Sequence, residues 1–310
     1  MKEVSRYETC NRYKGSNWNY EHAIKYILQL GDDELVEVGC FTHFRDKKII
    51  KNVIELPSSL GCPMRCKFCA SSSIPFLRKL SVEEELMIFD YIYQNEQLTC
   101  HSPLVISFTG IGDIFFTLDT VENAILNIGN IRSDFQFTVS SCRWTAEMFK
   151  RIEKIYEKVI FRAIQITYIS SKKDILEDAI SYYKLDPADT LNFDSTIELI
   201  KKSSIPRCRI NYLMLSGLND SREDFLTFIS TVTPVKEKIW VRISKLNVTK
   251  ASTVNQMSVS TLERMEELKA LLEENGIYAY LFYAMEDDGI GCGQLLSEAY
   301  IGDNNMKNFS

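Results

Sequence analysis

Several features are scarce in this sequence, and each scarcity narrows what the chain can be. There is no run of about 20 apolar residues, so no membrane helix is expected. The first residues, MKEVSRYETCNRYKG, lack an apolar signal segment, which favours a cytoplasmic protein. Only 3 histidines are present, and none stands at a zinc-finger spacing from clustered cysteines. Lys and Arg number 36 against 42 Asp and Glu, and the resulting charge of −6 argues against a broad basic surface for RNA.

The chain has enough material for one principal domain. Its 310 residues are 45% hydrophobic and 25% charged, which is ordinary globular composition. After residue 50, short β-branched or aromatic runs alternate with longer amphipathic segments, a pattern typical of βα units. The expected strands cover 51–59, 104–110, 135–141, 159–168, 208–215 and 239–247. We therefore predict an α/β fold, a partial (β/α)6 TIM-like barrel with catalytic groups at the carboxyl ends of its strands.

Three parts follow from this pattern. Residues 1–50 form a short extension, with a helix expected over 17–30 and a hairpin that begins at residue 35. Residues 51–284 form the barrel core, and residues 285–310 form a tail that carries Cys292. Amphipathic segments such as 81–94, 145–158 and 259–276 are predicted to be helices, the last ended by Gly276.

A cysteine triplet is the strongest chemical signal. Of 9 cysteines, Cys62, Cys66 and Cys69 stand at C-x3-C-x2-C directly after a predicted strand. Without an export signal these thiols should stay reduced and free to bind metal. Three thiolates on one loop can hold three irons of a [4Fe-4S] cluster and leave the fourth iron open. Structural zinc, which needs a fourth ligand, and chance clustering are the alternatives.

Motifs along the chain extend this pattern. SSLGCPMRCKFC, FTGIGD, INYLMLSGLND and EDDGIGCGQL resemble the radical S-adenosylmethionine (SAM) superfamily and, within it, the RlmN and Cfr RNA methyl synthases, from about residue 35 to residue 296. In that superfamily the open iron binds SAM, and an electron cleaves SAM to a 5′-deoxyadenosyl radical. The resemblance therefore implies two cofactors, a [4Fe-4S] cluster and SAM. It also implies an external electron donor such as flavodoxin or ferredoxin.

The same resemblance suggests a SAM pocket. Glycines in FTGIGD allow close backbone approach to a ligand, and a carboxylate can accept hydrogen bonds from the SAM ammonium. Polar residues at the ends of the third, fourth and sixth strands match SAM-contacting positions, although each could instead cap a helix. The expected SAM-binding residues are Phe68, Gly110, Gly112, Asp113, Ser140, Ser141, Thr167 and Asn247. The related enzymes have glutamate where this chain has Asp113, so this contact should be shorter or water-mediated.

Cys292 matches the methyl-carrying cysteine of RlmN and Cfr. There the cysteine takes a methyl group from one SAM, loses a hydrogen to a radical from a second SAM, and adds to an sp2 carbon of adenine. A flexible, glycine-flanked thiolate suits this chemistry. The chain departs from the family at Glu55, where the relatives have a second cysteine that resolves the adduct. Glutamate could act as a base but cannot form a disulfide, so Cys142 is the expected substitute.

These features predict a methyl or methylene transferase that uses a methylated Cys292 to modify an sp2 carbon of a small molecule, nucleotide or peptide. RNA adenine methylation is an alternative, disfavoured by the acidic charge and by an extension too short for the RNA-recognition domain of RlmN. That alternative predicts a basic groove across the barrel mouth. The third possibility is a non-catalytic iron–sulfur or zinc protein.

Overall fold

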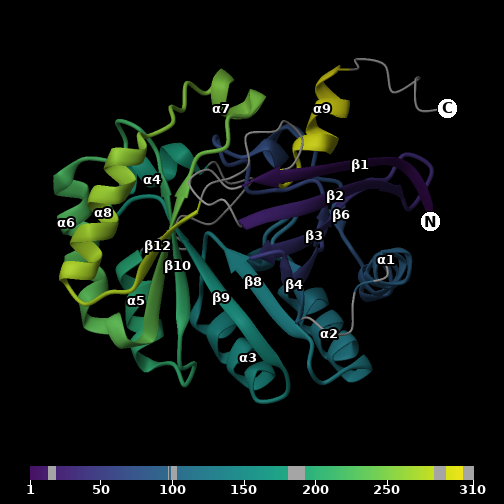
Figure 1. The fold of residues 1–310 in the computed structure, drawn as a ribbon, viewed down its shortest axis with the longest axis horizontal. Coiled ribbons are helices and arrows are strands. Elements are labelled where there is room, and N and C mark those ends of the chain that lie inside the picture. Colours follow the sequence, from purple (N-terminus) through teal and green to yellow (C-terminus); the bar gives the residue numbers. More distant parts are fainter. Residues whose placement is uncertain (13–18, 97, 99–102, 181–192, 283–290, 303–310) are drawn as a thin grey trace.

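The computed structural model describes residues 1–12, 19–96, 98, 103–180, 193–282 and 291–302 (Figure 1). The strands are β1 (Lys2–Arg12), β2 (Asn19–Gln29), β3 (Leu35–Arg45), β4 (Lys48–Glu55), β5 (Ser59–Leu60), β6 (Arg78–Lys79), β7 (Leu104–Phe108), β8 (Gln136–Ser141), β9 (Ile160–Tyr168), β10 (Cys208–Met214), β11 (Ile239–Lys245) and β12 (Ala279–Phe282). The helices are α1 (Val82–Asn95), α2 (Ile114–Ile131), α3 (Ala146–Tyr156), α4 (Lys173–Ala179), α5 (Phe193–Lys202), α6 (Arg222–Val232), α7 (Lys250–Val254), α8 (Leu262–Glu274) and α9 (Gln294–Gly302), with 3-10 turns at Ala70–Ser73 and Thr233–Lys238.

One curved sheet organises the molecule. Its ten strands run in the order β1-β2-β3-β4-β7-β8-β9-β10-β11-β12. Strands β1 to β4 pair antiparallel, and from β4 onward every neighbouring pair is parallel. The sheet does not close, because β1 and β12 remain its two edges. The predicted partial barrel is confirmed, and the carboxyl ends of its parallel strands gather at one end.

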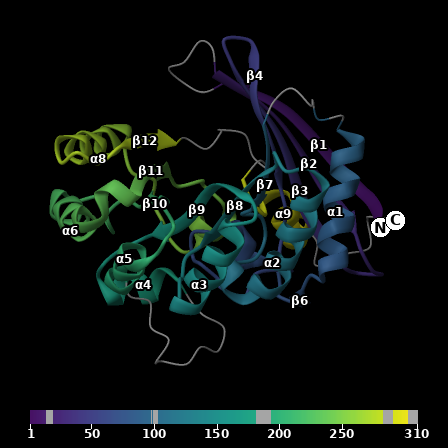
Figure 2. The same cartoon turned by 90° about the horizontal axis from the view of Figure 1, so that it is seen from below.

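The helices cover the outer, convex face of this sheet. Figures 1 and 2 show α2, α3, α5, α6 and α8 outside the parallel strands. The main core lies between these helices and the outward side chains of the strands, for example Ile210, Tyr212 and Met214 of β10. Among the described residues, no helix is both long enough and apolar enough to cross a membrane.

The inner face of the strands is different in character. Arg209 and Asn211 alternate with the outward residues of β10, and Arg242 and Ser244 do the same on β11. Successive side chains of a strand point to opposite faces, so a strand with apolar residues outside and polar residues inside builds a core and a polar lumen together. The alternation in the sequence therefore specifies both.

The structure corrects the expected N-terminal region. The segment 17–30 was predicted to be helical, but the described part of it is strand β2, paired with β1 and β3. Tyr26 and Leu28 are buried, as are Ala23 and the intervening Lys25 and Ile27, so the segment is buried on both faces and its periodicity was misleading. Strands β1 and β12 were also missed. Because β1 to β3 continue the barrel sheet, the boundary at residue 50 falls within one sheet; the division into three parts stays a prediction.

The starts of three helices and the end of one follow known capping patterns. Ser81 and Glu84 form a capping box at α1, and Thr145 and Thr261 cap α3 and α8. The predicted end of α8 is confirmed, since Gly276 follows it with a φ of +73°.

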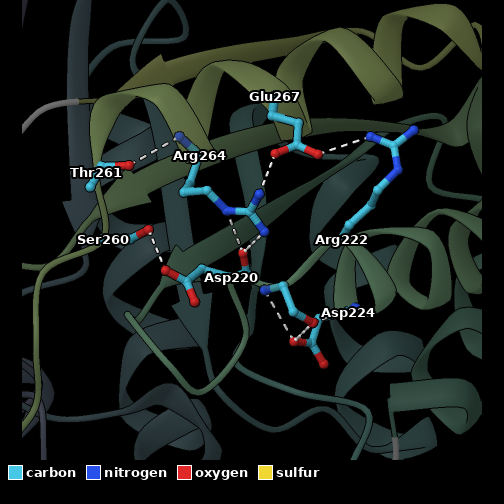
Figure 3. A network of polar contacts seen from close by, with 8 residues as sticks. Asp220, Arg222, Asp224, Ser260, Thr261, Arg264 and Glu267 are labelled. Carbon is cyan, nitrogen blue, oxygen red and sulfur yellow. Dashed lines mark hydrogen bonds and ion pairs between the residues drawn. The ribbon is translucent and has the colours of Figure 1, made fainter.

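The loop after β10, within INYLMLSGLND, is held by polar contacts rather than exposed to a ligand. Buried Asn219 bonds backbone groups of Leu213, Leu215 and Ile169. Figure 3 shows the neighbouring Asp220 between Ser260 and Arg264, and Glu267 between two arginines. This motif has a structural role in joining α6 to α8.

Candidate functional site

The cysteine loop follows β4 and leads into the 3-10 turn Ala70–Ser73. Cys62 and Cys66 are buried, Cys69 is half-buried, and none of the three forms a disulfide. The backbone N–H of Cys69 donates to the carbonyl of Cys66 at 3.0 Å. Gly61 has a φ of +70°, and a side chain there would meet the carbonyl oxygen of Pro75 at 2.0 Å, so the loop needs glycine at its start. The predicted triplet is thus brought together in a fixed loop.

The environment of this loop favours protonated thiols. Burial raises the pKa values of Cys62 and Cys69, while a hydrogen bond with Cys142 and burial raise that of Cys66. The charges of neighbouring cysteines also raise the pKa values of Cys62 and Cys66, which indicates that these side chains lie close together. Among the described residues, no group of three or more His, Cys, Asp or Glu side chains is arranged to hold one metal ion. A cubane cluster needs no such convergence, because each thiolate binds a different iron.

The glycines of FTGIGD pack tightly against the segment after β4. A side chain at Gly110 would meet the carbonyl oxygen of Leu56 at 2.6 Å. Gly112 has a φ of +114°, and a side chain there would meet the hydroxyl of Ser58 at 2.4 Å. Both glycines are therefore required by the fold itself, and their predicted contact with SAM stays a prediction.

Asp113 is also held by the chain. Its carboxylate caps α2 by accepting the N–H of Phe115 at 2.8 Å, and it accepts the hydroxyl of Ser141 at 2.6 Å and the N–H of Cys142 at 3.1 Å. Burial raises its pKa to about 6, although these hydrogen bonds lower it. The carboxylate joins the second and third strand ends, so any bond to SAM would add to a structural role.

Cys292 stands immediately before α9, which packs on β2, β3 and the 3-10 turn after the cysteine loop. Its Sγ lies 4.0 Å from the Ser71 hydroxyl. Gly293 has a φ of +74°, and a side chain there would meet that hydroxyl at 2.4 Å. Residues 286–290 of EDDGIGCGQL lie outside the described residues. The structure thus brings Cys292 to the cysteine loop.

The expected thiolate is not what this environment favours. Burial, followed by the charges of Glu55 and Cys69, raises the pKa of Cys292 well above its usual value, and Lys25 only partly offsets this. The sequence pattern suggested a flexible, ionised cysteine because glycines flank it. The structure instead shows a half-buried thiol beside two carboxylates.

Glu55 and Cys142 take different places. Glu55 ends β4 and lines the same cavity as Cys292. Its carboxylate accepts Lys25 at 2.8 Å and the Thr109 hydroxyl at 3.1 Å. Cys142 instead contacts the Cys66 thiol. The two proposed substitutes for a second cysteine are therefore not equivalent, since only Glu55 shares the cavity with Cys292.

A cavity of about 1150 Å³ runs along the inner face of the barrel. At the carboxyl ends of the strands its wall includes Glu55, Thr109, Ser140, Asn247 and Cys292. Thr167 and Phe68 are half-buried outside this wall, Phe68 within the apolar cluster around the cysteine loop. Four predicted site residues are thus brought to one end of one cavity.

The other end of the cavity is basic and aromatic. Its basic side chains are Arg45, Lys51, Arg162, Arg207, Arg209 and Arg242, with aromatic rings at Phe161, Trp240, Tyr278 and Tyr280. Arg207 and Tyr278 precede β10 and β12, so this end lies where the parallel strands begin. Glu55 is the only carboxylate in the described lining. A strongly positive lumen therefore exists inside a chain whose net charge is −6.

Comparison with known proteins agrees with this geometry. No protein-family profile matches the chain. The chain is 26% identical over 206 residues to the probable dual-specificity RNA methyltransferase RlmN of Dictyoglomus turgidum, covering 64% of this chain and 56% of the relative. It is 22% identical over 278 residues to that of Desulforudis audaxviator, covering 88% and 81%. A radical SAM methyltransferase from Sphaerobacter thermophilus has a TM-score of 0.72 at 16% identity, over 94% of this chain and 80% of that one. The chain has the radical SAM fold and resembles RlmN.

The predictions of a radical SAM fold and of an enzyme resembling RlmN are confirmed by these comparisons. The radical SAM fold implies a [4Fe-4S] cluster and SAM as cofactors. The chain spans just over half the length of the Dictyoglomus turgidum relative. Its reaction, substrate and individual site residues are therefore taken up as proposals.

Sequence reasoning missed several residues in and around this cavity. Lys25 and Glu37 were hidden because their segments were assigned to an accessory extension, although a charged residue within an apolar run is itself a signal. Arg209 and Arg242 were read only as strand residues. Their alternation with buried apolar positions could have placed them in the lumen.

Proposed function

We propose that the chain is a radical SAM C-methyltransferase that uses Cys292 as its one-carbon carrier and modifies an sp2 carbon of a nucleotide base in RNA. The observation that carries this proposal is that one cavity has Cys292 at one end and arginines and aromatic rings at the other. The names of two relatives, both probable RNA methyltransferases, support the same substrate class.

The cofactor sites follow from the positions described above. Cys62, Cys66 and Cys69 would hold the cluster, and the expected SAM residues of FTGIGD and the strand ends would bind SAM beside it. When bound, these groups supply a 5′-deoxyadenosyl radical that abstracts hydrogen. An external one-electron donor such as flavodoxin or ferredoxin would be the partner that starts the reaction.

The chain's own residues then act on the carbon carrier and the substrate. Cys292 would hold the one-carbon unit at the cavity wall. Glu55, on the same wall, is placed to accept the proton that the substrate carbon loses. Cys142, which is hydrogen-bonded to the Cys66 thiol, stays a candidate for resolving the adduct.

The basic lumen supports a polyanionic substrate. Burial lowers the pKa of Arg209, and the charge of neighbouring Arg162 lowers it further, so the two arginines repel each other. Arg209 Nε has no hydrogen-bond partner. A phosphate would relieve both effects, and aromatic rings such as Trp240 offer surfaces on which bases stack.

This arrangement changes the earlier weighing of RNA. Net charge disfavoured RNA because it was taken as a property of the whole surface. The structure gathers six basic side chains in the lumen, and RNA modification is the named activity of the relatives. A free nucleotide is the second candidate, since a cavity of about 1150 Å³ also has the size of a small-molecule site.

The test is product analysis with the anaerobically reconstituted, full-length protein. SAM, reductant and either total RNA or a nucleotide mixture are supplied, and the digested nucleosides are examined for a methylated base. We expect a mass gain of about 14 Da, the mass of one added methylene, on a base from RNA. Gain only on free nucleotides would shift the assignment to the second candidate, and no gain on either would overturn it.

A further inference from the structure

Three buried charges form a unit beside Cys292. Lys25 on β2 is 1% exposed, and its Nζ donates to Glu37 Oε1 at 3.0 Å and to Glu55 Oε2 at 2.8 Å. Burial by itself lowers the pKa of Lys25, but the charges of Glu55 and Glu37 outweigh burial and raise it overall. The three side chains come from β2, β3 and β4, so the unit crosses the antiparallel part of the sheet.

Glu37 connects this unit to the segment that carries Cys292. Glu37 is 3% exposed, and its two oxygens accept the backbone N–H of Gly293 and of Leu296, each at 2.9 Å. Gly293 immediately precedes α9 and Leu296 lies in its first turn, where N–H groups have no intrahelical partners. A buried carboxylate from β3 thus caps α9 and fixes the backbone on which Cys292 stands.

Lys25 makes this cap compatible with Glu55. Two buried carboxylates close together disfavour each other's ionised form unless a cation lies between them. Gly39 leaves room for the lysine, because a side chain there would meet the Phe41 ring at 2.6 Å and Lys25 Cε at 3.3 Å. Removing one partner of a buried charge pair leaves the other uncompensated, which is strongly unfavourable.

We propose that Glu37 and Lys25 are positioning residues for Cys292, and that the Lys25–Glu55 ion pair occupies the place that a second cysteine has in the related enzymes. The inference rests on the proposed carrier role of Cys292. Glu37 holds the backbone around the thiol, and Lys25 bridges Glu37 and Glu55 by donating a hydrogen bond to each carboxylate. The N-terminal strands are thereby part of the catalytic site.

The first experiment measures the anchor directly in the full-length reconstituted protein. Glu37→Gln retains the shape but loses the charge, and one of its two atoms can no longer accept a backbone N–H. We expect amide hydrogen exchange at Gly293 and Leu296 to accelerate about tenfold or more, the effect of one lost hydrogen bond to a charged group. Cys40, buried on the same strand, should stay equally resistant to alkylation, because the sheet remains folded.

Glu34→Gln is the matched control. Glu34 lies just before β3 and pairs with Arg78, so its substitution removes a carboxylate nearby without touching α9. Exchange at Gly293 and Leu296 should then match the unsubstituted protein. Unchanged exchange in Glu37→Gln, or equal acceleration in both variants, would overturn the anchoring proposal.

A second experiment tests the link to chemistry. The fraction of Cys292 that carries a methyl group is measured by mass spectrometry, and iron content is measured in parallel. We expect Glu37→Gln to lower the methylated fraction severalfold while iron stays bound. If the unsubstituted protein carries no methyl group, the proposed function fails while the exchange result still decides the anchor.

The third experiment concerns the replaced cysteine. Glu55→Cys leaves Lys25 with one carboxylate, whereas the double variant Lys25→Met with Glu55→Cys removes the cation as well. Exchange at Gly293 is compared among Lys25→Met, Glu55→Cys and the double variant. If the pair acts as a unit, exchange in the double variant should be slower than the two single effects added together predict. Additive effects of the two substitutions would contradict the pairing.

Discussion

The two ends of the barrel cavity treat charge in opposite ways. At the carboxyl ends of the strands, Glu55 is satisfied by Lys25, which is in turn shared with Glu37. At the other end, Arg207 donates to the carbonyl oxygen of Ile239 and lies over the Trp240 ring, and Arg209 bonds the hydroxyl of Tyr280. No carboxylate in the described part of the chain pairs with either arginine.

This difference suggests that one end of the cavity positions the backbone and the other end binds a ligand. A buried charge with a fixed partner stabilises one arrangement of the backbone, here the segment that carries Cys292. Arginines that repel one another store unfavourable energy that an anionic ligand can relieve. We therefore expect substitutions at the first end to abolish chemistry and substitutions at the second end to weaken binding.

The largest effect should come from the cluster loop, which would end chemistry without changing the basic end. Replacing Cys62, Cys66 and Cys69 together by alanine should reduce bound iron from about four per chain to none, because no thiolate remains to hold it. Formation of 5′-deoxyadenosine should stop as well. Iron and sulfide analysis checks this, and full iron content in the variant would contradict the cluster assignment. RNA affinity should remain, since the arginines are untouched.

Cys292→Ala should cause a loss at a later step. The variant should bind iron and cleave SAM, yet transfer no carbon, because the carrier atom is gone. In the unsubstituted protein, the peptide around Cys292 should carry an added mass of about 14 Da, the mass of one methylene. Peptide mass spectrometry measures it. An active enzyme with unmethylated Cys292 and a competent alanine variant would remove the carrier role. Cys142→Ala should trap an adduct on Cys292 if Cys142 resolves it.

Substitutions at the basic end should weaken RNA binding without abolishing it. Arg209→Ala should weaken RNA binding by about 10- to 100-fold, since one hydrogen bond between charged groups contributes about 1.5–3 kcal/mol. The slope of log affinity against log salt should fall by about 1 per lost phosphate contact. Titrations at several salt concentrations measure both. Arg151→Ala, which removes an outer arginine paired with Glu122, should change neither. Equal losses in both variants would show that the lumen is not the binding surface.

Parts of this comparison were predictable from sequence, for physical reasons. Six of the seven parallel strands and the cysteine triplet are local signals, because apolar alternation and ligand spacing are present in consecutive residues. The resemblance identified Glu55 as the position of the second cysteine, but it did not show where the Glu55 side chain lies relative to Cys292. Lys25 stands out as a charge within an apolar run, but its partners could not be foreseen, because they depend on β2 being a strand and on the room left by Gly39.

The basic lumen was missed for a different reason. Net charge sums residues over the whole chain and carries no information on where they lie. Arg162, Arg209 and Arg242 come from three strands and meet only when the sheet curves. Once the strand pattern is known, their inward phase could be read from alternation, so a search by strand face would have found them.

The smallest effect on the cavity is expected from a carboxylate that belongs to neither end. Its substitution sharpens the comparison because both ends should stay unchanged. Glu85 on α1 is fully buried, and burial, then the charges of Asp119 and Glu84, raise its pKa to about 9. The folded chain thus keeps a proton that the unfolded chain loses above pH of about 4.5, so stability falls as pH rises from there toward 9. Glu85→Gln removes this titration. It should raise the free energy of unfolding by up to about 5 kcal/mol at pH 8, since each of the roughly 3.5 pH units above 4.5 corresponds to about 1.4 kcal/mol, and have little effect near pH 4. Thermal unfolding of both proteins across this range measures the difference. A gain that is equal at both pH values would show that packing, not the proton, is responsible, while iron content and RNA affinity should not change in either case.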